Sequence, residues 1–334
     1  MNDREAAASP ATSRATSSRR PLVTIGISTY NRADGYLRQA LQSAIDQTYP
    51  NLEIVVSDNC STDDTEAVVR GAGDPRIRYI KQAVNIGANN NFNFCVQEAR
   101  GAYFLLLHDD DLVDADFVEA CMDAVHDDTT VGLIRAGTRV IDGGGTVLSV
   151  TPNRVGGLST ADFMLGWFSG KTTLYLCSTL FNTRRLAELG GFHSKKLVFQ
   201  DVVAEMILAA RYGRADVLDV KATFRRHGLN MGSAARLHDW VEDSVFLLDV
   251  MCDLVPADRR AEVRRQGMAF FSRTNYRHVG ALPSWPQRLN AYRLVHRRFA
   301  YAYSPLRYVA QWYIRDMKRR VRMLQTAATR LRRP

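Results

Sequence analysis

Short apolar runs recur along the first two-thirds of the chain, and stretches with helical periodicity separate them. The runs at 22–28, 52–56, 77–80, 103–107 and 131–136 are brief, apolar or β-branched, and bounded by turn residues, so they are predicted strands. Between them, apolar residues return every three or four positions, which is typical of amphipathic helices. Strands that alternate with helices predict βαβ units, and therefore an α/β fold with a mostly parallel central sheet flanked by helices.

The run from Tyr103 to Leu107 is the centre of this pattern, because three carboxylates follow it closely. An unbroken apolar run predicts a strand buried on both faces, and Asp109, Asp110 and Asp111 would emerge at its carboxyl end, where ligands bind in open α/β sheets. Adjacent carboxylates repel one another, and oxygen ligands suit Mg²⁺ or Mn²⁺ rather than zinc. A helix-capping turn is the alternative. Three aspartates in a row favour a metal–phosphate site.

The rest of the chain changes character twice. Residues 138–150 predict a hairpin, 172–181 an added strand, and 217–224 an extended segment before a polar, glycine-bearing loop at 225–233. Beyond residue 236 the pattern is helical throughout. We therefore expect a disordered leader at 1–20, a catalytic domain at 21–235 and a helical C-terminal extension at 236–334.

The final helix is basic and amphipathic, with a Trp and a Tyr near its start. Residues 311–333 place apolar side chains at spacings of three and four, with arginines and lysines between them. Such a helix either packs its apolar stripe on the domain or attaches to an anionic membrane surface, where each basic residue adds on the order of 1 kcal/mol. The sequence favours peripheral membrane contact.

Composition narrows the setting. Of 334 residues, 46% are hydrophobic and 24% charged, which is typical of globular proteins, and no apolar stretch is long enough to span a bilayer. Five scattered cysteines indicate a reducing compartment, so we expect a cytoplasmic protein, in contact with the cytoplasmic membrane face through its basic tail. The net charge of +9 by itself also allows nucleic acid or an acidic partner.

Five motifs make the chain resemble the family 2 glycosyltransferases of the GT-A fold. They are VTIGISTYNR at 23–32, QTYPNLEIVVSDNCSTDDT at 47–65, NIGANNNFN at 85–93, HDDDLVDADF at 108–117 and FQDVVAEMILAARYG at 199–213. Each motif alone is weak, but five in the family's order span about two-thirds of the chain. The last hundred or so residues lie outside the resemblance.

The resemblance implies a Rossmann-like sheet whose first half binds a nucleotide-diphosphate sugar. Asp58 matches the aspartate that hydrogen-bonds the nucleotide base. A second group of positions matches the loop along the nucleoside, and it comprises Thr29, Tyr30 and Asn31. Tyr30 could stack on the base or be a core tyrosine, and Asp58 could instead be a turn residue.

The resemblance also implies a metal and a catalytic base. Asp110 is the expected direct ligand of Mn²⁺ or Mg²⁺, with Asp111 as a further metal ligand and Asp109 on the nucleotide or sugar. Asp201 matches the base that takes the proton from the acceptor hydroxyl, and it also stands where a helix N-cap belongs. His227 lies in the 225–233 loop and could add a metal ligand, although a plain surface loop is the alternative.

The implied function is inverting transfer of a hexose or deoxyhexose from a nucleotide-diphosphate sugar to an acceptor hydroxyl, in cell-surface polysaccharide or glycolipid assembly. The acceptor would be a saccharide or a lipid-linked saccharide, and no nucleic-acid partner is expected. Two alternatives remain open. A sugar nucleotidyltransferase would need a glycine-rich basic loop after the first strand, where this chain has STYNRADG. A non-catalytic basic interaction protein on a transferase-like scaffold would not need Asp58, Asp110 and Asp201.

Overall fold

The structure is a computed structural model that describes residues 20–33, 35–228, 235–314 and 317. These residues form one nine-stranded sheet with the order β3-β2-β1-β4-β8-β6-β9-β5, and β7 pairs with β6 outside this path. The strands are β1 Val23–Thr29, β2 Leu52–Asp58, β3 Ile77–Lys81, β4 Tyr103–His108, β5 Leu112–Val113, β6 Leu133–Asp142, β7 Val147–Thr151, β8 Thr179–Asn182 and β9 Arg214–Arg226. The predicted α/β architecture is confirmed.

Apart from a helical stretch at 305–314, the described residues form ten α-helices. They are α1 Tyr36–Ile45, α2 Thr65–Arg70, α3 Ala88–Glu98, α4 Phe117–Ala124, α5 Thr160–Phe168, α6 Thr183–Glu188, α7 Gln200–Tyr212, α8 Leu237–Leu254, α9 Ala257–Val279 and α10 Trp285–Arg298. Two hydrophobic cores lie on the two faces of the sheet. One includes Leu105 and Leu107 of β4, and the other includes Phe104 and Leu106. The alternation of one strand between two cores explains why its sequence is apolar without a break.

The parallel half of the sheet brings three strand ends together. In the register of β1 with its neighbours, Thr29 pairs with Asp58 of β2, and Ser28 pairs with His108 of β4. The carboxyl ends of β1, β2 and β4 therefore meet at one edge, where Asp109 and Asp110 follow directly. This places the acidic run at the edge that the sequence predicted.

The other half of the sheet is largely antiparallel. Strand β8 lies antiparallel between β4 and β6, and the β6–β7 hairpin confirms the predicted hairpin. The predicted strand at 172–181 is shorter than expected, since a 3₁₀ turn at Leu176–Ser178 (η1) precedes β8. Strand β9 runs parallel to β6 and returns to the acidic run, where β5 pairs with it. The second half of the chain thereby closes one side of the site.

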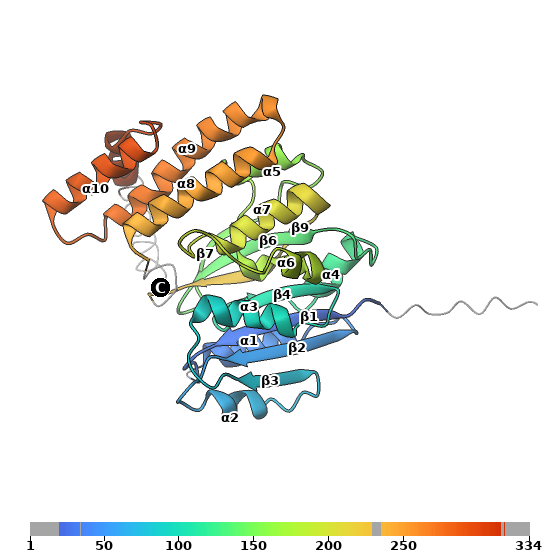
Figure 1. Ribbon diagram of the computed structural model, residues 1–334. Helices are drawn as coiled ribbons and strands as arrows, with labels where there is room; N and C mark the ends of the chain where they lie inside the picture. Colours follow the sequence, from blue (N-terminus) through green and yellow to red (C-terminus); the bar gives the residue numbers. More distant parts are fainter. Residues whose placement is uncertain (1–19, 34, 229–234, 315–316, 318–334) are drawn as a thin grey trace, which may run out of the picture.

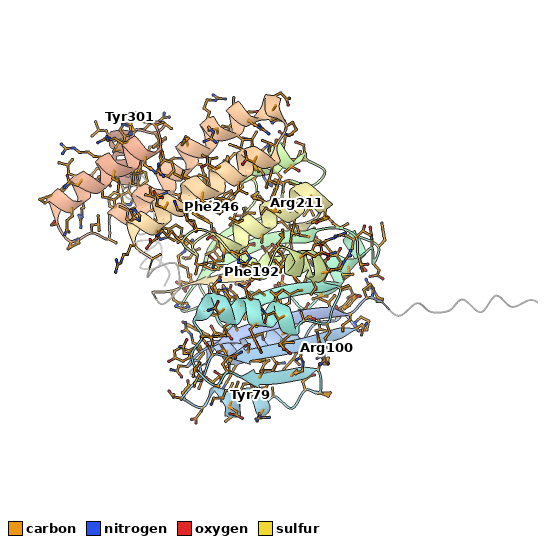
Figure 2. All side chains as sticks on the ribbon, viewed as in Figure 1. Tyr79, Arg100, Phe192, Arg211, Phe246 and Tyr301 are labelled. Carbon is orange, nitrogen blue, oxygen red and sulfur yellow. The ribbon has the colours of Figure 1, made fainter. Side chains whose placement is uncertain are left out.

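The C-terminal helices pack on this framework. In Figure 1, α8, α9 and α10 lie at the end of the molecule opposite β3 and α2, with α7 between them and the sheet. Their side chains join those of the sheet-covering helices (Figure 2), and Phe271 and Val295 belong to the same core as Phe104 and Phe192. The extension is thus continuous in its packing with the part of the chain that forms the sheet.

Residues 305–314 add a further helical stretch. Most of the basic amphipathic helix predicted at 311–333, and the leader at 1–19, lie outside the described residues. Among the described helices, none has the length and apolar character that crossing a membrane would require.

Candidate active site

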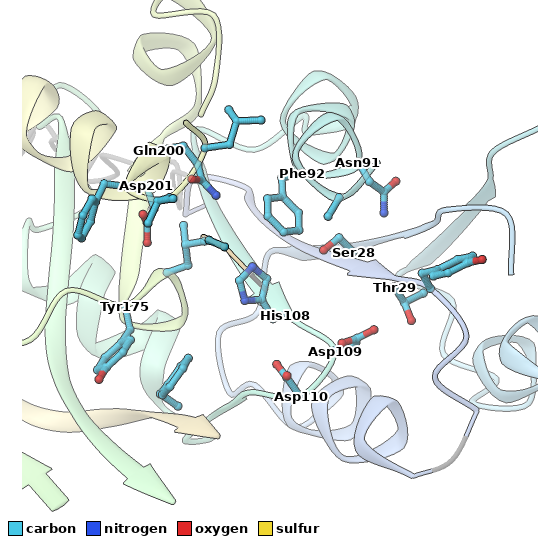
Figure 3. A pocket seen from close by; sticks show the side chains of 18 of the residues that line it. Ser28, Thr29, Asn91, Phe92, His108, Asp109, Asp110, Tyr175, Gln200 and Asp201 are labelled. Carbon is cyan, nitrogen blue, oxygen red and sulfur yellow. The ribbon is translucent and has the colours of Figure 1, made fainter. Parts of the chain in front are cut away.

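A cleft of about 520 Å³ opens at the carboxyl ends of β1 and β4. Figure 3 shows Asp109 and Asp110 on one side of it and Gln200 and Asp201 on the other, with His108 between them. The two groups come from segments about 90 residues apart, namely the end of β4 and the start of α7. The acidic run and the expected base thus share one cavity.

Asp110 lies at the centre of the acidic cluster. Its Oδ2 is 2.7 Å from Nε2 of His227, and ligand atoms of His108, Asp110 and Asp111 all lie within 4.8 Å of one another. His227 follows the end of β9, and the pairing of β9 with β5 carries it to Asp110. The expected metal residues Asp111 and His227 therefore each lie close to Asp110, although among the described residues the group whose ligand atoms could share one ion is His108, Asp110 and Asp111.

Asp111 is the most deeply placed of the three aspartates. It is 1% exposed, and its Oδ1 accepts the backbone N–H of Arg225 at 2.8 Å. Arg225 also donates to the carbonyl of Asp110 and lies over the ring of Tyr36. Burial, and then the charge of Asp110, raise the pKa of Asp111 well above its usual value. These contacts make Asp111 a bridge between the acidic run and β9.

Asp109 faces the cleft beside Arg32. Burial, and then the neighbouring Asp110, raise the pKa of Asp109 to about 7, while Arg32, whose Nε is 3.7 Å from Oδ1, opposes this rise. Burial also lowers the pKa of His108, so its imidazole is neutral, and among the described residues its buried Nε2 has no hydrogen-bond partner. Crowded carboxylates beside a neutral imidazole suit a divalent cation in their donor set.

Asp201 lies on the opposite wall, in the first turn of α7. The N-cap of that helix is Phe199, so the expectation that Asp201 is the cap is wrong by two positions. Burial raises the pKa of Asp201 to about 6, and backbone hydrogen bonds oppose the rise. A carboxylate with this pKa is ionised at neutral pH yet more basic than a solvated one, as a general base requires. The adjacent Gln200 has a buried Oε1 without a protein partner among the described residues, and it lines the cleft.

Besides Asp109, four residues are expected at the nucleotide, and they separate into two groups. Thr29 and Tyr30 line the cleft, and Tyr30 is 44% exposed, so its ring is accessible to a ligand. Asp58 is fully buried and does not line the cleft. Its Oδ1 accepts the Ser61 N–H at 2.8 Å, and its Oδ2 accepts from the Tyr79 hydroxyl.

The last of the four, Asn31, ties the β1 loop to the β2 loop. Its Oδ1 accepts the backbone N–H of Thr62, and its own N–H donates to Ser61. Asn59, in the loop after β2, forms hydrogen bonds with Asn85 and Ile86 and also lines the cleft. Asn59 is therefore the residue of that loop presented to a ligand, beside the buried Asp58.

Asp243 of α8 organises the segment before Asp201, and sequence reasoning missed it. This fully buried carboxylate accepts hydrogen bonds from the Ser194 hydroxyl at 2.6 Å and from the backbone N–H groups of Lys196, Val198 and Phe199 at 2.7, 2.8 and 2.9 Å. The only signal in the sequence is an aspartate among apolar residues on the inner face of a helix, and that does not name its partners.

Trp240, one turn earlier on α8, was also missed. It lines the cleft, packs edge-on against Phe199 and stacks on His278 at 4.3 Å. Its buried indole N–H has no acceptor among the described residues. An indole donor of this kind usually finds a partner when buried, so it is available to a ligand in the cleft.

A parallel half-sheet, with an acidic cluster at its carboxyl edge and a carboxylate on the opposite wall of the cleft, is the arrangement that the resemblance to GT-A transferases predicts. Residues 24–179 match the family model described as "Glycosyl transferase family 2". This stretch of the chain is a family 2 glycosyltransferase domain, and the fold is the GT-A fold. The resemblance inferred from the five motifs is confirmed.

Similar proteins agree with this assignment. The chain is 36% identical over 137 residues to a protein named chondroitin synthase from Escherichia coli, a stretch that covers 40% of this chain and 20% of that protein. It therefore spans about a fifth of that relative's length. S. aureus TarS 1-349 is similar in structure, with a TM-score of 0.62 at 14% identity, covering 86% of this chain and 82% of that one.

A mannosyltransferase from Pyrobaculum calidifontis, solved with GDP-Man and Mn²⁺, is similar with a TM-score of 0.51 at 19% identity. The similarity covers 85% of this chain and 86% of that one. A TarS complex with UDP-GlcNAc is similar with a TM-score of 0.56 at 14% identity, covering 84% of this chain and 91% of that one. At these identities the similarities establish the fold, and the ligands are those of the other proteins.

The Asp243 contacts can be tested without any substrate. In Asp243→Asn the side chain can no longer accept through both of its ends, so the amides of Lys196, Val198 and Phe199 should exchange with solvent roughly tenfold faster or more. Amide hydrogen exchange of the intact protein measures this. Asp239→Asn on the same helix is the control, and equal acceleration in both variants would contradict the assignment.

Proposed function

We propose that this protein is a metal-dependent inverting glycosyltransferase that moves a sugar from a nucleoside-diphosphate donor to an acceptor hydroxyl. The observation that supports it best is the placement of Asp201 and Asp110 on opposite walls of one cleft. A carboxylate base away from the metal and a phosphate-binding centre are the two parts that direct displacement at a sugar carbon requires.

In this mechanism the acceptor hydroxyl lies against Asp201. Its oxygen attacks C1 of the donor sugar as the Asp201 carboxylate takes the hydroxyl proton. The bond between C1 and the diphosphate oxygen breaks, and the nucleoside diphosphate leaves with the electron pair. A single displacement inverts the configuration at C1, and no covalent enzyme intermediate forms.

Asp110 and His227 are the residues that would hold Mn²⁺ or Mg²⁺, with His108 and Asp111 adjacent. When bound, the cation offsets the negative charge that develops on the leaving diphosphate. Arg32 lines the cleft beside Asp109, where it would orient a phosphate directly or the donor sugar by holding the Asp109 carboxylate. The nucleoside of the donor would then lie near Thr29, Tyr30 and Asn59.

For Asp58 the proposal is that it acts on the nucleotide through the loop that it fixes. Both of its oxygens already accept hydrogen bonds from Ser61 and Tyr79, so a direct bond to the base would have to replace one of them. A carboxylate that holds the β2 loop keeps Asn59 at the cleft. The nucleotide base itself is left open by this arrangement, because the Asn59 side chain already donates to Asn85 and accepts from the backbone N–H of Ile86.

The role we propose is assembly of a cell-surface polysaccharide or glycolipid at the cytoplasmic membrane face. The helical extension supports the membrane contact, since it exposes large apolar side chains, of which Trp285 is 78% and Leu306 82% exposed. Arginines lie among them, at positions 288, 293, 297, 298 and 307. Exposed aromatics with basic neighbours fit the interface of an anionic bilayer.

Asp201→Asn should lower the transfer rate by about 10²- to 10⁴-fold, because the amide cannot take the acceptor proton. Donor binding, measured by calorimetry, should change little, and Asp219→Asn on the surface of β9 is the matched control. In the parent protein the rate should rise with pH through about 6 and then level off, since the base must be ionised. Loss of donor affinity in well-folded Asp201→Asn would argue against this role.

Asp110→Ala should abolish the part of the donor-induced rise in melting temperature that depends on Mn²⁺. A ligand that binds only the folded state raises its stability, so a thermal-shift panel of nucleoside diphosphates with and without Mn²⁺ reports the site directly. Asp46→Ala, an exposed aspartate on the edge of α1, controls for a change of one charge. An unchanged Mn²⁺-dependent shift in Asp110→Ala would place the cation elsewhere.

The membrane contact is tested by sedimentation with vesicles. Phosphatidylcholine vesicles that contain phosphatidylglycerol should pull down the protein, whereas pure phosphatidylcholine vesicles should not, and added salt should weaken the binding. The double variant Trp285→Ser/Leu306→Ser should bind less than a Leu218→Ser control, whose side chain is 59% exposed on β9. Equal binding to both vesicle types would rule out the electrostatic contact.

A further inference from the structure

A second cavity, of about 660 Å³, lies between the catalytic half of the chain and the helical extension. Four segments of the chain form its walls: the end of α5, the end of β9, α9, and residues 305–314. A cavity of this size accommodates one or two sugar rings. It is separate from the cleft that holds Asp110 and Asp201.

Its polar lining is cationic. Arg226, Arg273 and Arg277 line it, and none of its lining residues in the described part of the chain is a carboxylate. Within the described part of the chain none of these three arginines has a salt bridge to an Asp or Glu. The surrounding sequence has the same bias, because residues 263–314 contain nine arginines and no Asp, Glu or Lys. Guanidinium groups without carboxylate partners favour an oxyanion ligand.

Its apolar lining is aromatic. Trp167 and Phe270 line the cavity with their ring centroids 4.7 Å apart, and Trp312, 57% exposed, lines it from residues 305–314. Flat rings beside hydrogen-bonding cations match a sugar, whose C–H face packs on aromatics while its polar groups meet donors. A free inorganic anion has no C–H face that could pack on these rings.

The wall between the two cavities is formed by Arg226 and Tyr175. The Arg226 guanidinium lies beside the phenol of Tyr175, where it opposes the rise in the Tyr175 pKa that burial causes. Tyr175 stacks on Phe224 at 4.2 Å, and both line the main cleft. In Figure 3, Tyr175 and Asp201 lie on the same side of that cleft, away from Thr29. The second cavity thus adjoins the side from which an acceptor would reach Asp201.

We propose that this cavity is an acceptor subsite for an acidic saccharide, whose carboxylate or phosphate binds Arg273 and Arg277 while a neighbouring sugar presents its hydroxyl to Asp201. The inference rests on the proposed function, since it assigns the acceptor class of the same enzyme. Uronic acids and sugar phosphates share the oxyanion that the arginines recognise. Arg226 would contact the ligand where the two cavities meet.

The test compares charged sugars with matched neutral ones. Binding of methyl glucuronoside, glucose 1-phosphate and methyl glucoside to the full-length protein is followed by saturation-transfer NMR, with and without the nucleoside diphosphate that binds best. Both charged sugars, or one of them, should bind at least about tenfold more tightly than methyl glucoside, and added salt should reduce the difference. The carboxylate and phosphate arms decide which oxyanion the cavity prefers.

Paired variants locate the binding. Arg273→Gln/Arg277→Gln should remove the preference for charged sugars, whereas Arg293→Gln/Arg297→Gln, which removes the same charge from α10, should keep it. Trp312→Ala is a second route to the same loss should the first pair unfold. Melting temperature and nucleotide binding of each variant are measured in parallel, and both should stay unchanged.

Three outcomes would overturn the inference. The first is no preference for charged sugars in a protein that binds nucleotide, and the second is an equal loss of that preference in both double arginine variants. The third is loss of vesicle binding without loss of sugar binding in Arg273→Gln/Arg277→Gln. The last would make the cavity part of a membrane contact. In each of these cases the proposed transferase stands, because nucleotide binding is retained. Failure of the parent protein to bind any nucleoside diphosphate would instead count against the proposed function.

Discussion

The carboxylate of Asp243 is the contact on which the geometry of the cleft depends. The segment from Ser194 to Phe199 has no regular secondary structure, so its backbone N–H groups need partners outside the segment. Asp243 accepts three of them, together with the Ser194 hydroxyl, inside the protein and away from water. Asp201 follows two residues after Phe199, so the helical extension fixes where the proposed base stands.

A buried ion pair connects α7, the helix that carries Asp201, to β6 of the sheet. Arg135 of β6 and Glu205 of α7 are both fully buried, and Nε and Oε2 lie 3.0 Å apart. Burial nevertheless raises the pKa of Glu205 to about 7, so the favourable charge of Arg135 does not fully offset desolvation. One turn of helix separates Glu205 from Asp201, and the charge of Asp201 adds to the rise in the pKa of Glu205. Asp243 therefore fixes the segment before α7, and the Arg135–Glu205 pair fixes the helix itself.

The sequence predicted those features that depend on neighbouring residues. A buried strand can be predicted from a short continuous apolar run such as 103–107, because few other structures bury every residue of such a run. A strand end that is followed by Asp109 and Asp110 indicates the ligand-binding edge of the sheet. The five motifs located the fold and the expected site residues. Their roles stay predictions, although the structure brings Asp110, Asp111 and His227 together.

The features that the sequence did not predict depend on contacts between distant segments. Insertion of β8 antiparallel between β4 and β6 follows from packing across the sheet, and nothing near residue 179 encodes it. The burial of Asp58 depends on the Tyr79 hydroxyl from the neighbouring strand. The Asp243 contacts join residues at least 44 positions apart. The exact cap of α7 was missed by two positions because an aspartate in the first turn and one at the cap serve the helix dipole alike.

The proposed donor site is easier to infer from the sequence than the proposed acceptor site, because the two lie largely in different parts of the chain. The family match ends at residue 179, where β8 begins beside the parallel half of the sheet. Four residues of the proposed site come after it, namely Asp201, His227, Trp240 and Asp243. All three arginines of the second cavity also come after it. The proposed donor side uses strand ends that lie inside the family match. Recognition of an acceptor, however, needs a surface on the far side of Asp201, which in our proposal is the second cavity, and α8 of the helical extension also fixes the segment before Asp201.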